Sequence, residues 1–116
     1  MNGQAGADAV VVVLTSLPDA ETAARIAATV VGERLAACVN IGAPGTSVYR
    51  WQGVIETATE VAVLFKTSAA VQPELIGRLA ELHPYEVPEI LAWTPAEVAS
   101  DYARWVRAQT GPEQGD

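Results

Sequence analysis

The chain has 116 residues, and 50% of them are apolar, which is enough for one domain with a core of its own. Acidic residues outnumber basic residues by 14 to 7, and the resulting net charge of −7 argues against nucleic acid as the main partner. With one cysteine and one histidine, a single chain can form neither an intrachain disulfide nor a tetrahedral Cys/His zinc site.

The N-terminal segment predicts neither export nor membrane insertion. Residues 1–7 lack a basic region followed by an apolar stretch, and the apolar run over 9–14 is too short to span a membrane. We therefore expect a cytoplasmic protein with no membrane partner. The predicted organisation is a flexible N-terminus over 1–8, a single domain over 9–110 and a flexible tail over 111–116.

The first third of the chain predicts a strand followed by a helix. The β-branched run over 9–14 is typical of a central strand that is buried on both faces. Ser16 as N-cap and Pro18 in the first turn indicate a helix start, and we expect the helix to run from about Asp19 to Arg34. Its apolar residues at helical spacing are Ala23, Ile26, Ala27, Val30 and Val31.

A long hairpin is predicted over residues 36–67. An apolar stretch over 35–41 is broken or bulged at residues 42–45, and residues 46–52 then alternate with Tyr49 and Trp51 on one face. The dipeptide Gln52-Gly53 is a plausible tight turn, and residues 60–67 return as the second arm.

The remainder of the chain predicts a helix, a short strand and a final helix. The second helix covers 71–82, with Leu75, Ile76, Leu79 and Leu82 facing inward, and His83-Pro84 stops it because the residue before a proline avoids the helical region. A strand over 87–93 and a helix over 95–108 follow, the helix having Val98, Tyr102, Trp105 and Val106 at helical spacing.

The order β-α-β-β-α-β with a C-terminal helix predicts an α+β fold, a ferredoxin-like sandwich with helices on one face of an antiparallel sheet. The hairpin is too long for so small a domain, so its tip has nothing of its own to pack on. We expect Tyr49 and Trp51 to lie in an interface, because aromatic residues are enriched where subunits meet.

Five blocks in the sequence resemble the CutA family of divalent ion tolerance proteins. They occur in the family's order, and the similarity extends from about Val10 to Ala108. The blocks are residues 35–40 (LAACVN), 47–53 (SVYRWQG), 64–67 (LFKT), 83–90 (HPYEVPEI) and 101–105 (DYARW).

The resemblance implies a stable homotrimer whose strands continue from one subunit's sheet into the next, similar in architecture to the PII signalling proteins. It also implies a role in tolerance of copper and other divalent cations, without an established enzymatic reaction. In the family members that bind copper, the resemblance implies three ligands: a cysteine at the end of the first strand and two adjacent histidines before Pro-Tyr. At those positions this chain has Thr15, Leu82 and His83.

His83 and Glu86 are the candidate metal ligands. Imidazole is the commonest transition-metal ligand, and Glu86 lies three residues further on. The competing interpretation of His83 is a helix C-cap that favours the negative end of the helix dipole. Cys38 would suit Cu(I), but its small apolar surroundings favour an inert core thiol.

The candidate ligand cleft contains Arg50, Lys66, Tyr85 and Glu89, and we expect it to lie between subunits. Two functions remain open. A CutA-like protein would bind copper weakly through His83 and carboxylates, whereas a PII-like sensor would bind a small anion through Arg50 and Lys66 and signal to a partner protein. No nucleophile–base motif, P-loop or dinucleotide-binding motif is present, and we therefore expect no enzymatic activity.

Overall fold

The computed structural model describes residue 6 and residues 8–113, so the predicted flexible residues 1–5, 7 and 114–116 lie outside the described part. Seven elements follow one another in the predicted order, with α1, α2 and α3 as helices. They are β1 (Val10–Leu17), α1 (Ala20–Gly32), β2 (Cys38–Trp51), β3 (Val54–Ser68), α2 (Gln72–Leu82), β4 (Ile90–Trp93) and α3 (Ser100–Gln109).

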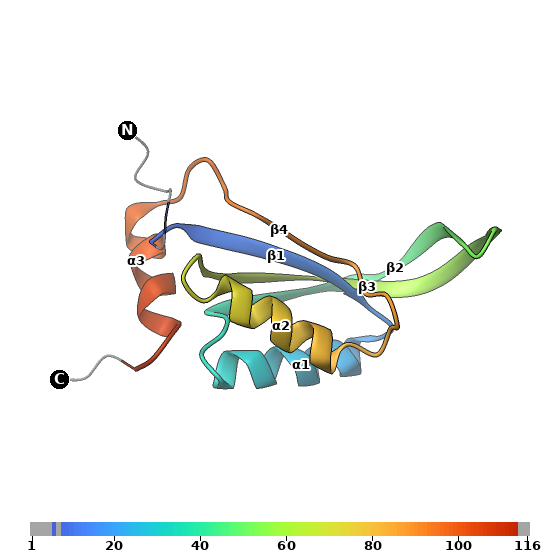
Figure 1. Cartoon of the computed structure of the whole chain (residues 1–116), viewed down its shortest axis with the longest axis horizontal. Helices are drawn as coiled ribbons and strands as arrows, with labels where there is room; N and C mark the ends of the chain where they lie inside the picture. The colour runs from blue at the N-terminus through green and yellow to red at the C-terminus, as the bar shows by residue number, and fades with distance from the viewer. Residues whose placement is uncertain (1–5, 7, 114–116) are drawn as a thin grey trace.

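The strands form one four-stranded antiparallel sheet in the order β2-β3-β1-β4. Helices α1 and α2 lie side by side on one face of this sheet, and α3 lies at one end of it, beside the start of β1 (Figure 1). This arrangement confirms the predicted ferredoxin-like α+β fold. It leaves β2 and β4 as the two edge strands, with unpaired backbone groups along their outer sides.

The main core lies between the sheet and the two helices. Alternate residues of β1 and β3 point into it, and they meet the apolar stripes of α1 and α2. Its fully buried members include Val13, Leu17, Ala23, Val30, Val61, Val63, Phe65 and Leu75. The other face of the sheet is covered only at one end, where Val10 packs against Ala103 and Val106 of α3.

The hairpin of β2 and β3 is much longer than the strand that supports it. Of the residues of β3, only Val61–Ser68 pair with β1. In the outer part of the hairpin, β2 and β3 therefore pair only with each other. It extends beyond the rest of the molecule at the end opposite α3 (Figure 1). The tip is a two-residue turn in which Gln52 and Gly53 both have positive φ angles, 51° and 82°, which matches the right-handed twist of the arms.

A bulge sits in β2 where the sequence predicted one. The register of β2 against β3 shifts between Ile41 and Pro44, since Pro44 has no backbone N–H for the ladder. The shift lies close to the point where the hairpin leaves the support of β1.

Several predicted boundaries and faces were wrong. Strand β1 continues through Ser16 to Leu17, and the side chain of Asp19, not Ser16, caps α1 by accepting a hydrogen bond from the Thr22 N–H at 2.7 Å. Val31 is 41% exposed because it falls at the edge of the apolar stripe. Strand β4 begins at Ile90, after Pro88, and α3 begins only at Ser100.

Candidate functional site

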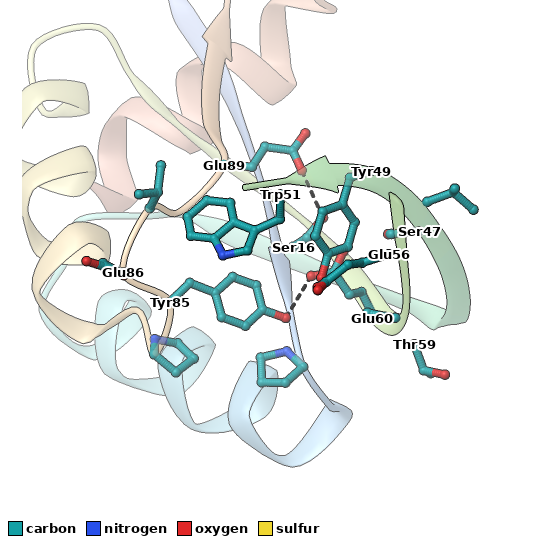
Figure 2. A pocket seen from close by; sticks show the side chains of 15 residues that line it. Ser16, Ser47, Tyr49, Trp51, Glu56, Thr59, Glu60, Tyr85, Glu86 and Glu89 are labelled. Carbon is teal, nitrogen blue, oxygen red and sulfur yellow. Dashed lines mark hydrogen bonds between the residues drawn. The ribbon is translucent and has the colours of Figure 1, made fainter. Parts of the chain in front are cut away.

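A pocket of about 870 Å³ lies where the outer half of the hairpin meets the segment that joins α2 to β4. Three parts of the chain contribute to it: the end of β1, both arms of the hairpin and residues 84–89 (Figure 2). Its lining residues are Ser16, Pro18, Ser47, Val48, Tyr49, Trp51, Glu56, Ala58, Thr59, Glu60, Pro84, Tyr85, Glu86, Val87 and Glu89.

Carboxylates give the pocket its charge. Glu56 and Glu60 come from β3, and Glu86 and Glu89 come from the segment before β4. None of the described residues that line the pocket is a lysine, an arginine or a histidine. The potential inside the pocket therefore favours a cation over an anion.

Aromatic rings form the second feature of the pocket. Tyr49 and Trp51 come from β2, and Tyr85 approaches from the segment after α2. The three rings and the carboxylates of Glu56 and Glu60 surround the same space (Figure 2). The exposed fractions of Tyr49 and Trp51 are 41% and 39%, so a large part of each side chain is accessible in a single chain.

Two hydrogen bonds fasten the walls of the pocket together. The Tyr85 hydroxyl donates to Glu60 Oε2 at 2.7 Å, and this contact joins the segment after α2 to the hairpin. The Ser16 hydroxyl donates to Glu89 Oε1 at 3.1 Å, which joins β1 to the start of β4. Burial, reinforced by the Glu60 carboxylate, raises the pKa of Tyr85, so its hydroxyl remains a donor.

His83 lies just behind this pocket and does not line it. The side chain is only 9% exposed, and both ring nitrogens have partners. Thr15 Oγ1 donates to the Glu89 carbonyl at 2.6 Å, so the contact of 3.0 Å between Thr15 Oγ1 and His83 Nε2 is a donation from the ring N–H. His83 Nδ1 accepts from the Tyr85 backbone N–H at 3.2 Å.

The hydrogen bonds define His83 as a neutral imidazole with its proton on Nε2. Burial lowers the pKa of His83, and the Ser16 backbone and the Glu60 charge oppose that shift only in part. The His83 backbone N–H donates to the Leu79 carbonyl at 2.9 Å and ends α2. His83 thus occupies the C-cap position that the competing interpretation predicted, but its neutral ring has no charge with which to favour the helix dipole. The ring instead positions Tyr85.

The predicted cleft residues fall into two groups in a single chain. Tyr85, Glu86 and Glu89 line the pocket together with Tyr49 and Trp51. Arg50 is opposite Ile55 near the hairpin tip and outside the lining. Lys66 on β3 lies opposite Val12 of β1 and Cys38 of β2. It is four residues along β3 from Ala62, the residue opposite Ser16 at the pocket, which is a separation of about 13 Å.

Lys66 and Cys38 form a separate polar group on the sheet. The Lys66 ammonium and the Cys38 thiol both approach Asn40 Oδ1, with a sulfur–oxygen distance of 3.9 Å for Cys38. Cys38 is only partly buried, so the expectation of a buried core thiol was wrong. Over residue 6 and residues 8–113 the structure contains no group of three or more His, Cys, Asp or Glu side chains that could share a metal ion.

Two pocket carboxylates were not among the candidates from the sequence. The two-residue turn at Gln52-Gly53 fixes the register of the hairpin, and this register places Tyr49 opposite Glu56 and Gly45 opposite Glu60. The signal was therefore present in the turn and in the alternation of the strand. The role of Thr15 had no such signal, because its contact with His83 joins residues that are 68 positions apart.

The sequence profile of a family described as CutA1 divalent ion tolerance protein matches residues 11–109. The chain belongs to the CutA family. It is 48% identical over 100 residues to the divalent-cation tolerance protein CutA of Thermus thermophilus, with 86% of this chain and 97% of the relative covered. A relative with the same name from Yersinia pestis is 40% identical over 98 residues, covering 84% of this chain and 82% of that protein.

Solved CutA structures have the same fold. The structure of the divalent cation tolerance protein from Thermus thermophilus superposes with a TM-score of 0.84 at 47% identity, covering 88% of this chain and 99% of the other. CutA from Xylella fastidiosa gives a TM-score of 0.85 at 38% identity, with 88% and 98% covered. The recognition of the family from the five sequence blocks is confirmed.

The buried imidazole leads to a prediction about pH. Because the folded state lowers the pKa of His83, the unfolded chain binds a proton more readily, and stability is lost as pH falls below 6.5 toward the folded pKa. We expect the ring signals of this sole histidine to titrate with a pKa below 6.5 by NMR. The free energy of unfolding should decline as the pH falls below 6.5 toward the folded-state pKa of His83.

His83→Gln is the matched control, since it removes the titrating group and should flatten this part of the decline. A folded-state pKa at or above 6.5 would contradict the burial and the hydrogen bonds described for this ring.

Proposed function

We propose that this protein acts in the tolerance of divalent metal ions as a homotrimer and contacts the cation through the carboxylates of its pocket. Membership of the CutA family supports the role in tolerance. The observation that carries the site is the pocket lining, which combines Glu56, Glu60, Glu86 and Glu89 without a basic side chain among the described residues. No enzymatic step is part of this proposal.

Copper binding in this proposal is weak and does not use His83. A metal at His83 Nε2 would have to displace the hydrogen bond to Thr15. A metal at His83 Nδ1 would occupy the lone pair that accepts the hydrogen bond from the Tyr85 backbone N–H. The donor set expected from copper-binding relatives is also incomplete, because Thr15 and Leu82 provide no thiolate or imidazole. Carboxylates with retained water molecules are the remaining ligands, and they hold a cation less tightly than a full set.

The trimer is supported by the surfaces that one chain leaves uncovered. The face of the sheet opposite α1 and α2 exposes Leu64, Leu91 and Trp93 by 36%, 51% and 47%. Apolar residues exposed next to one another on a monomer are typical of an interface. The two open edges, β2 and β4, are different in sequence, and pairing one with the other is a head-to-tail contact, the type of contact from which closed rings are built.

The PII-like alternative, a sensor of small anions, has less support. It requires Arg50 and Lys66 at the ligand, and neither belongs to the pocket lining in a single chain. A neighbouring subunit would have to bring them to the site.

No helix of the described residues is long and apolar enough to cross a membrane.

The trimer can be tested on the open face of the sheet. We expect Trp93→Glu to place a charge in the interface, to reduce the mass measured by light scattering from three chains to one and to lower the melting temperature. Val31→Glu is the matched control, because Val31 has a similar exposure, 41%, on a helix away from this face. A Trp93→Glu protein that remains trimeric and equally stable would contradict the assignment of the interface.

The cation site can be tested by calorimetric titration with Cu(II). Glu56→Gln combined with Glu89→Gln should weaken binding about tenfold or more, because two unit charges near the cation are removed. His83→Gln should change the affinity by less than about threefold, since the ring already has partners for both nitrogens. Binding that is lost in His83→Gln and unaffected by the glutamate changes would overturn this site.

A further inference from the structure

We propose that the pocket also binds an organic cation, a molecule with an ammonium or guanidinium head and a small apolar body. This inference goes beyond metal tolerance and does not require a metal at the site. Three independent properties of the pocket lead to it: its rings, its charge and its size.

The rings provide surfaces for a cation with little bound water. A positive group within about 6 Å of the face of Trp or Tyr is attracted by the electrons of the ring. Tyr49, Trp51 and Tyr85 line one cavity and come from two distant parts of the chain. The three rings approach the same cavity from β2 and from the segment after α2 (Figure 2). A small hydrated metal ion gains little from such walls, whereas an alkylated ammonium gains much.

The rings stand next to carboxylates in fixed positions. Tyr49 and Glu56 are directly opposite each other on neighbouring strands, which brings their Cβ atoms to about 4.5–5.5 Å. Tyr85 is held by its hydrogen bond to Glu60. A cation placed between the rings therefore meets a ring face and a carboxylate together, and the described lining offers no positive side chain to compete with it.

The size of the cavity separates this class of ligand from a bare metal ion. A volume of about 870 Å³ lies in the range of sites for small molecules, which is about 300–1,000 Å³. Divalent ions bind tightly where several ligand atoms converge within about 2.0–2.6 Å. The part of the chain that the structure describes places no three His, Cys, Asp or Glu side chains close enough for that. A bulky cation needs no such convergence.

The test is calorimetric titration of the whole protein with choline, for the ammonium head, and with agmatine, for the guanidinium head. The neutral control ligand is 3,3-dimethyl-1-butanol, which has the shape of choline without its charge. We expect saturable binding of at least one of the two cations. The neutral molecule should bind at least about tenfold more weakly, and added salt should weaken the binding of the cation.

Variants assign the binding to the pocket. Glu56→Gln and Tyr49→Leu should each weaken the binding of the cation at least about fivefold, while Glu74→Gln on α2, which lies outside the pocket lining, should leave it unchanged. The mass and melting temperature of each variant are checked first, because Glu56→Gln keeps the shape of the side chain and should keep the assembly intact.

Three outcomes would overturn the inference: no saturable binding of either cation, equal binding of the neutral control, or binding that Glu56→Gln does not change. The first of these is also the result expected if a neighbouring copy of the chain fills the pocket. If the unaltered protein bound choline or agmatine but did not bind Cu(II), only the proposed metal site would be overturned. The two proposals therefore fail separately.

Discussion

The hairpin of β2 and β3 is longer than the sheet that supports it, and the other features of the molecule depend on this mismatch. Strand β1 reaches only as far as Val61 on β3, and the bulge at Ile41 to Pro44 lies close to this limit. Beyond it, no other strand of the described residues pairs with the two arms. Their rings and carboxylates therefore remain available to other partners, which are the segment after α2, a ligand and neighbouring copies of the chain.

The segment after α2 closes the pocket because His83 holds its start in place. The neutral ring joins β1, through Thr15, to the backbone of Tyr85, and Tyr85 then reaches Glu60 on the hairpin. A hydroxyl at position 15 and a neutral imidazole at position 83 are complementary, since one accepts the proton that the other donates. This pairing gives a structural reason why the single histidine of the chain positions Tyr85, and in the proposed function it leaves the binding of a cation to the carboxylates.

The fold was predictable from the sequence because each element carried a local signal: a β-branched run, helical spacing, a bulge and the turn at Gln52-Gly53. The boundaries that failed at Ser16 and at Val87 lie where strand pairing decides the end of an element. The start of α3 at Ser100 instead of Pro95 has no such pairing to explain it. The pocket was predictable in part. Tyr49, Trp51, Tyr85, Glu86 and Glu89 were candidates, and the hairpin register implied Glu56 and Glu60. The hydrogen bonds of Thr15 behind the pocket, to His83 and to the Glu89 carbonyl, join residues 68 and 74 positions apart, and no sequence pattern indicates them.

Cations are expected to meet the carboxylates of the pocket while His83 stays a structural residue. The most direct measurement is an anomalous difference map of crystals of the assembled protein that have been soaked in Cu(II). The predicted result is a peak beside the carboxylates of Glu56, Glu86 or Glu89, with His83 still bonded to Thr15. A peak within bonding distance of either His83 nitrogen, with the Thr15 contact broken, would contradict this expectation.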